Sequence, residues 1–203
     1  MDAINNNKYI FLIVAPSGTG KTEFCKILQE KHKLRSIASY TTRMRRYEGE
    51  TGHTFVTKEE FDSLPNKVAY TLYDDNEYCA TQEQVDNADL YVIDVAGVEY
   101  FKRTYKGTKK AIVVKLCASD LTRIIRMLQR GDSLDAVIKR LEVDEVEFAD
   151  FKYDLSINAE RSLKTMVLTF LIKTRLMPLS LLLNKISRRI DRFDDNIQSL
   201  MEG

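Results

Sequence analysis

The chain has 203 residues, of which 44% are hydrophobic and 30% are charged, and its formal net charge is +1. This composition is typical of a soluble globular protein, and the length allows one domain with a sizeable core, with or without a tail. A net charge so close to zero gives no electrostatic argument for a nucleic acid or a membrane surface as partner. Three cysteines at scattered spacings argue against a disulfide framework or a zinc site and favour a reducing, cytoplasmic compartment.

The first strong pattern lies near the start of the chain. The first seven residues, which include Asp2 and three asparagines, are largely polar and predict no signal peptide. The continuous apolar run at 9–15 predicts a strand buried on both faces of a parallel sheet. A glycine-rich turn at 16–20 follows, and apolar residues then recur at helical spacing between 24 and 28. This order of strand, loop and helix is the context of a phosphate-binding loop, and the segment nearly fits G-x-x-x-x-G-K-[ST], with Ala15 in place of the first glycine.

The residue types of this loop suit a triphosphate. Two of its glycines can adopt backbone angles closed to other residues, so that successive N–H groups converge on one anion at a helix N-terminus. Lys21 would reach the β- and γ-phosphates of ATP, and the Thr22 hydroxyl would help to hold Mg²⁺. The candidate ATP-binding residues are Ser17, Gly18, Thr19, Gly20, Lys21 and Thr22. The alternative is a glycine-rich turn with a chance Gly-Lys-Thr.

A second motif carries a family resemblance. A short strand is expected around 35–39, and Ser-Tyr-Thr-Thr-Arg-x-x-Arg follows at 39–46. With Ala-Pro-Ser-Gly-Thr-Gly-Lys-Thr before it and Phe-Val-Thr-Lys-Glu-Glu-Phe at 55–61, this motif resembles guanylate kinase, and the resemblance covers roughly residues 8–160. It implies a three-layer α/β P-loop kinase fold with a parallel central sheet. The implied parts are a core at 1–39 and 82–159, a monophosphate-binding subdomain at 40–81, a helical lid at about 126–142 and extra C-terminal helices at 160–203.

The resemblance also implies which residues bind the phosphate of the acceptor nucleotide. Arg43 and Arg46 would grip it, with Arg45 as a substitute for Arg46, and Tyr78 would contact it after a turn at 74–77. Two guanidinium groups on one loop independently suit bidentate phosphate binding, while a solvated basic loop is the alternative. Thr57 and Glu60 form a capping-box pattern that predicts a short helix at 58–64, and a strand is expected at 68–73.

The chain departs from the family where the family recognises guanine. Its strand at 68–71 has no counterpart of the family's glutamate, and His53, or Thr54 under a shifted alignment, stands where the family has a tyrosine. Of the residues with which the family contacts the base, Ser39 and Thr81 are matched in this chain. His53 is a candidate to replace the tyrosine by stacking on the base or hydrogen-bonding to it. The missing carboxylate leaves a different (deoxy)nucleotide or a sugar phosphate as an alternative acceptor.

The second half of the chain contributes a carboxylate and several arginines. After a helix at 82–87, an apolar strand runs into Asp94, which could orient Mg²⁺ through water, touch the acceptor base, or simply cap a helix. A helix at 98–105, a strand at 109–117 and a helix at 121–128, capped by Ser119 or Asp120, are expected next. The pattern that follows resembles the family's lid, in which arginines close over the donor. The candidate lid residues are Arg130 and Arg140, with Arg126 as a weaker one. A helical hairpin with surface arginines is the alternative.

The last part of the chain completes the prediction. The strand expected at 151–159 resembles a family segment in which Asn158 would contact the adenine of ATP. Apolar spacing predicts an amphipathic helix at 163–174 and another at 182–200, whose narrow seam either packs on the domain or forms a homodimer. The sequence therefore predicts a Mg²⁺- and ATP-dependent kinase of GMP or dGMP. A catalytically silent interaction module is the competitor, and the intact Gly-Lys-Thr argues against it.

Overall fold

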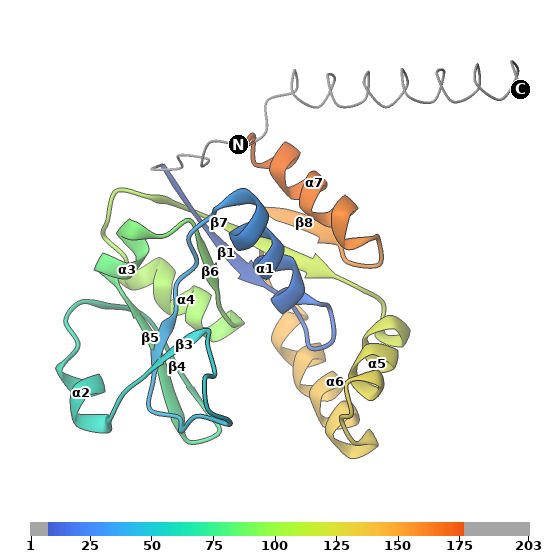
Figure 1. The fold of residues 1–203 in the computed structure, drawn as a ribbon, viewed down its shortest axis with the longest axis horizontal. Coiled ribbons are helices and arrows are strands. Elements are labelled where there is room, and N and C mark those ends of the chain that lie inside the picture. Colours follow the sequence, from blue (N-terminus) through green and yellow to red (C-terminus); the bar gives the residue numbers. More distant parts are fainter. Residues whose placement is uncertain (1–7, 177–203) are drawn as a thin grey trace, which may run out of the picture.

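The computed structural model describes residues 8–176 of the chain (Figure 1). Its centre is a parallel sheet of four strands. In spatial order they are β6 (Leu90–Val92), β1 (Tyr9–Val14), β7 (Lys110–Cys117) and β8 (Leu155–Asn158). All residues of β1 after Tyr9 are fully buried, as the continuous apolar run predicts for a strand covered on both faces.

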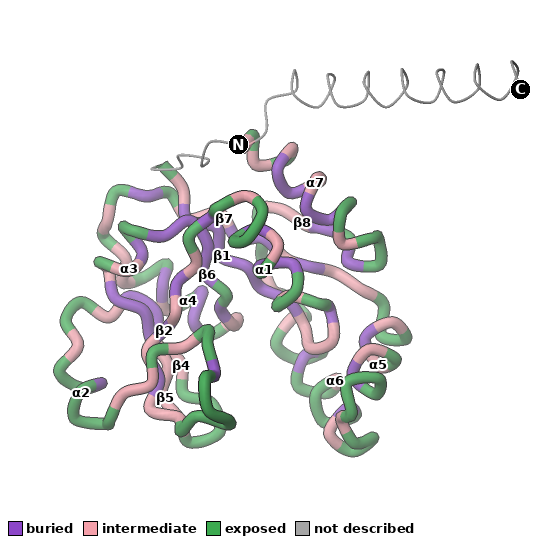
Figure 2. Tube along the Cα trace, viewed as in Figure 1, coloured by how far each residue is buried: buried purple, intermediate pink, exposed green. Residues whose placement is uncertain are grey.

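Helices cover both faces of this sheet, and the side chains of β1 alternate between them. Phe11 and Ile13 lie in one core cluster with residues of two helices, α1 (Lys21–His32) and α7 (Leu163–Lys173). Ile10, Leu12 and Val14 lie in a second cluster with α3 (Gln82–Asn87) and α4 (Val95–Thr104). The buried chain in Figure 2 accordingly runs through the centre of the fold. The predicted three-layer α/β architecture is confirmed.

A second, smaller sheet contains the Arg-rich motif. Its spatial order is β3 (His53–Phe55), β2 (Ser39–Thr41), β5 (Asn76–Thr81) and β4 (Lys67–Tyr73). Strand β4 reaches the main core, because Val68 and Ala69 belong to the cluster that includes α4. The helix α2 (Lys58–Ser63) begins with the predicted capping box between Thr57 and Glu60.

Two further helices, α5 (Asp120–Gln129) and α6 (Leu134–Phe148), form a helical hairpin that includes the region of the expected lid, and Ser119 rather than Asp120 caps the first. Gly131 lies in the bend with φ of 97°, a left-handed angle that glycine adopts without penalty. Figure 1 shows the hairpin and the small sheet extending from the same end of the parallel sheet. The phosphate-binding loop lies at this end, between β1 and α1.

Three sequence predictions need correction. The strand expected at 151–159 is limited to Leu155–Asn158, because its pairing with β7 begins and ends at these residues. The strand expected at 35–39 begins instead at Ser39, because Arg35 is bonded to Asp89 and Ser36 makes one isolated bridge to Leu90. The helix expected at 98–105 begins at Val95, because the Asp94 side chain caps it. The helix predicted at 163–174 is confirmed as α7.

The second C-terminal helix, expected at 182–200, lies outside the described residues, so its homodimer contact stays a prediction. Within residues 8–176, no helix combines the length and the apolar character that a membrane span requires.

Candidate functional site

The loop between β1 and α1 has the backbone of an anion cradle. Gly18 and Gly20 have φ of 77° and 90°, in the left-handed region. A Cβ at Gly18 would lie 2.6 Å from the backbone oxygen of Arg123, so a side chain has no room there. Thr19 is buried, and its hydroxyl donates to the Pro16 carbonyl. The sequence Ser-Gly-Thr-Gly therefore fixes a turn that leads directly into the N-terminus of α1, where N–H groups favour an anion.

Lys21 and Thr22 follow this turn in the first positions of α1. Lys21 Nζ lies 3.3 Å from the Ala15 carbonyl oxygen. Burial lowers the pKa of Lys21, while Cys25 and carboxylates that include Asp94 act in the opposite direction. The exposed Thr22 hydroxyl makes no hydrogen bond within the described part of the chain, so it is available to a ligand or a metal ion.

A cavity of about 200 Å³ connects Lys21 to the small sheet. Its described lining residues are Lys21, Ser39, His53, Ala69, Thr71, Tyr73, Tyr78, Tyr91, Val92, Ile93, Asp94 and Gly97. Three acceptor-site candidates, Ser39, Tyr78 and Asp94, thus share one cavity with the lysine of the loop. They come from three separate parts of the sequence, and the folding of the small sheet against α4 brings them together.

Two side-chain pairs form the polar wall of this cavity. Ser39 Oγ lies 2.9 Å from His53 Nδ1, and the His53 ring contacts Tyr78 edge to face at 5.5 Å between centroids. Burial, followed by the charge of Arg43, lowers the pKa of His53 and so favours the neutral imidazole. Asp94 Oδ1 accepts bonds from Gly97 N–H at 2.6 Å and from Thr71 Oγ1 at 2.9 Å.

Asp94 therefore does cap a helix, and it also faces the cavity. Its Oδ1 makes both of these bonds, and Oδ2 makes none within the described residues. Of the described residues that line the cavity, Asp94 supplies the only carboxylate. Ala69 and Thr71 of β4 line the same wall, so no carboxylate of this strand stands where the resemblance places the family's glutamate.

The acceptor arginines lie beside the cavity and do not line it. Arg43 Nη2 is 2.7 Å from Glu50 Oε1 and its Nη1 is 3.3 Å from Oε2, while Arg43 Nε is buried without a partner in the described region. The Arg46 N–H donates to Glu50 at 2.8 Å, but the Arg46 side chain is exposed. The hydrogen bond from the Arg43 side chain has the largest effect on Glu50 and the bond from the Arg46 N–H the next, and together they lower the pKa of Glu50 to about 2. Arg45 donates to the Glu50 carbonyl at 2.8 Å and lies over the Phe55 ring.

The remaining candidates do not line this cavity. Arg130 pairs with Asp132, Arg140 is exposed, and neither lines the cavity. Arg126, the weaker candidate, reaches the loop, because it donates to the Thr19 carbonyl at 3.1 Å. Asn158 accepts the Glu160 N–H at 2.8 Å at the end of β8, and Thr81 caps α3 by accepting the Gln84 N–H at 3.4 Å.

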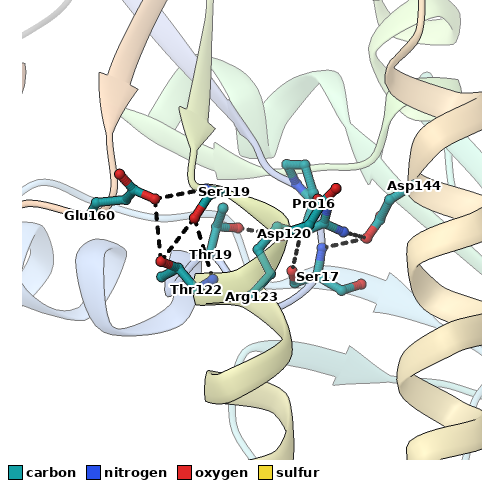
Figure 3. A network of polar contacts seen from close by, with 9 residues as sticks. All are labelled: Pro16, Ser17, Thr19, Ser119, Asp120, Thr122, Arg123, Asp144 and Glu160. Atoms are coloured by element: carbon teal, nitrogen blue, oxygen red, sulfur yellow. Dashed lines mark hydrogen bonds and ion pairs between the residues drawn. The ribbon is translucent and has the colours of Figure 1, made fainter.

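Two residues that the sequence did not single out contact the loop. Arg123 of α5 and Asp144 of α6 both bind the backbone of Ser17 (Figure 3). Among the described residues, no group of three His, Cys, Asp or Glu side chains is arranged to hold a metal ion.

The fold and the site define the class of protein. A parallel strand leads through a left-handed glycine loop into a helix, and a small sheet and a helical hairpin extend beside this loop. This is the architecture of a P-loop nucleoside monophosphate kinase. Comparison with known proteins extends this assignment. A family model described as an AAA domain matches residues 12–149.

Several relatives narrow the class to one family. The guanylate kinase of Mycoplasma pneumoniae is 30% identical over 167 residues, which cover 73% of this chain and 69% of the relative. The guanylate kinase of Bartonella quintana is 27% identical over 157 residues, 71% of each protein. The crystal structure of guanylate kinase from Anaplasma phagocytophilum shares the fold, with a TM-score of 0.53 and 16% identity over 86% of this chain and 90% of that chain. The present chain contains the AAA domain and belongs to the guanylate kinase family.

Proposed function

We propose that the chain transfers the γ-phosphoryl group of ATP to the phosphate of GMP or dGMP. The observation that carries this proposal is the cavity in which Lys21 of the phosphate-binding loop meets Ser39, Tyr78 and Asp94 of the acceptor side. A donor site and an acceptor site must adjoin for in-line transfer, and one cavity bounded by both meets this requirement. The names of the curated relatives, all guanylate kinases, support GMP as the acceptor.

The loop binds the donor in this proposal. The backbone N–H groups of Gly18, Gly20, Lys21 and Thr22 bind the β-phosphate, while the Thr19 N–H donates to the Pro16 carbonyl. Lys21 neutralises charge on the transferring group. Thr22 and Asp94 fit a Mg²⁺ ion, because the Thr22 hydroxyl and one Asp94 oxygen are unengaged within the described residues. The ion, when bound, neutralises charge on the β- and γ-phosphates. Asn158 contacts the adenine.

The acceptor phosphate binds Arg43, Arg46 and Tyr78, and the unpartnered Arg43 Nε supplies one donor for it. Ser39 and Thr81 contact the base. The free Asp94 oxygen can serve only one partner, so the guanine N–H groups that the family's glutamate would bind are the alternative to Mg²⁺ at this oxygen. An oxygen of the acceptor phosphate attacks the γ-phosphorus, a new P–O bond forms, and the bond to the bridging oxygen of ADP breaks. The attacking oxygen is already anionic, so no general base takes part.

Arg130 and Arg140 act after the hairpin closes over the donor. Both side chains are exposed, and closure would bring their charge to the transferring group and exclude water. A cytoplasmic location and a homodimer formed through residues 182–200 complete the proposal.

The decisive experiment measures ADP formation in a coupled assay with a panel of nucleoside monophosphates, deoxynucleoside monophosphates and a sugar phosphate. We expect turnover with GMP or dGMP. Lys21→Met should lower kcat by about a hundredfold or more, because it removes an electrostatic contact to the transition state. Lys26→Met is the matched control, since Lys26 is exposed on the same helix. The proposal fails if no guanine nucleotide increases ADP formation, or if Lys21→Met retains wild-type turnover.

A further inference from the structure

An ion pair joins the phosphate-binding loop to both helices of the hairpin (Figure 3). Asp144 Oδ2 of α6 accepts the Ser17 N–H at 2.9 Å, and Arg123 Nε of α5 donates to the Ser17 carbonyl at 2.9 Å. Arg123 Nη2 also pairs with Asp144 Oδ2, and its Nη1 lies 2.7 Å from Asp120. The side chains of Arg123 and Asp144 are only 7% and 10% exposed. We refer to Arg123, Asp144 and the backbone of Ser17 as the latch.

The latch constrains more of the loop than one residue. Both backbone polar atoms of Ser17 are occupied, which fixes the peptide planes on either side of it. The next residue, Gly18, lies against the backbone of Arg123, and Arg126 binds the Thr19 carbonyl. Three consecutive loop residues therefore contact one turn of α5. The N–H groups that would face a phosphate follow directly, so their direction depends on where this helix lies.

A contribution to stability does not by itself explain the buried pair of Arg123 and Asp144. Replacing a buried ion pair with apolar residues of similar volume is often neutral or stabilising, because removing two charges from water is costly. The apolar replacements would nevertheless leave the Ser17 N–H and carbonyl without these partners. The specific contribution of Arg123 and Asp144 is therefore to the shape of the loop.

We propose that Arg123 and Asp144 are positioning residues, which hold the donor loop in its anion-binding shape and attach the base of the hairpin to it. Neither residue lines the cavity beside Lys21, and both contact the donor loop at the backbone of Ser17. The proposal rests on the kinase function proposed above, because it identifies the loop as the ATP site.

Single substitutions give the first test. Asp144→Asn keeps the volume but removes the charge that Arg123 and the Ser17 N–H share, and Arg123→Lys keeps the charge but removes the planar fork. We expect each variant to raise the KM for ATP, and the dissociation constant of ATP measured by equilibrium titration, about tenfold, as expected for a lost charge-assisted hydrogen bond. The KM for GMP should stay within twofold of wild type. Equal increases in both KM values would contradict a role specific to the donor loop.

A double variant separates positioning from stability. In Arg123→Met with Asp144→Leu, the unpaired charge of each single variant is gone, so we expect Tm to equal or exceed those of the single variants. ATP affinity should remain about tenfold weaker than wild type, because Ser17 still lacks its partners. Recovery of both Tm and ATP affinity in the double variant would overturn the proposal and leave the pair a structural role only.

The chain offers a matched control at another site. Asp89 is buried, accepts the Arg35 N–H at 2.9 Å and pairs with the Arg35 guanidinium at 3.0 and 3.1 Å, so it repeats the chemistry of the latch away from the loop. Asp89→Asn should lower Tm and leave the ATP dissociation constant unchanged.

ATP binding by the wild type without phosphoryl transfer would refute only the kinase function. A wild type that does not bind ATP would refute both proposals.

Discussion

Alanine at Gly18 tests how tightly the loop is held against α5. The residue has φ of 77°, and an added Cβ would lie 2.6 Å from the Arg123 carbonyl oxygen and 3.0 Å from its Cα. Both neighbouring atoms belong to the backbone of a helix, so neither can rotate away as a side chain would. Gly18→Ala must therefore shift the loop or the first turn of α5.

The cost has two parts. A non-glycine residue in the left-handed region costs about 1–2 kcal/mol, and overpacking of a closely packed site costs about 1–3 kcal/mol more. Together they predict a loss of about 2–5 kcal/mol in the free energy of unfolding. Gly49→Ala is the matched control, because its φ is 79° and no atom lies within 4 Å of the added Cβ. It should cost only the first part, about 1–2 kcal/mol.

Urea denaturation of both variants, followed by circular dichroism, measures this difference, and ATP titration measures its consequence for the site. We expect Gly18→Ala to be the less stable variant and to bind ATP more weakly than Gly49→Ala does. Equal free energies of unfolding would refute the close approach of α5 to the loop. Wild-type ATP affinity in Gly18→Ala would refute the role of that approach in shaping the site.

Three further substitutions test the acceptor side. The pKa of Glu50 is lowered from 4.5 to about 2, so the ionised carboxylate stabilises the fold fully above about pH 4.5, and this contribution is lost as the pH falls toward 2. When the free energy of unfolding is measured from pH 5 to pH 2, it should therefore fall less in Glu50→Gln than in wild type. Tyr78→Phe should raise the KM for GMP about tenfold through a lost hydrogen bond to phosphate, with the KM for ATP unchanged in steady-state assays. Thr57→Ala should remove about 1 kcal/mol of capping energy, detected by urea denaturation, without changing either KM.

The phosphate-binding loop could be predicted from the sequence because its determinants are contiguous. A buried strand, two glycines and a helix start follow one another within 14 residues of Tyr9. The capping boxes at Thr57 and Thr81 are local in the same way, since each joins residues three positions apart. Short-range hydrogen bonds of this kind depend on residue type and spacing, which the sequence states directly.

The latch could not be predicted, because it joins residues that are far apart in the chain. Ser17 lies 106 residues from Arg123 and 127 residues from Asp144. Asp144 also lies in a helix where charged residues surround it in the sequence, and before folding it resembles any solvated carboxylate. Its burial follows from the orientation of α6 against the loop, which local patterns do not specify. The same reasoning applies to the bond between Thr71 and Asp94, because Thr71 lies in β4 of the small sheet and Asp94 caps α4.

The arginines of α5 show how helix geometry links the predicted and the observed contacts. Arg123, Arg126 and Arg130 are spaced three and four residues apart, so they lie on one face of the helix. The first two contact the loop. Arg130 is seven residues beyond Arg123, about 10 Å farther along the axis, where it pairs with Asp132 instead. Because Arg123 attaches the base of α5 to Ser17, the hairpin closure proposed above would move the far end of the helix, with Arg130, farther than its base.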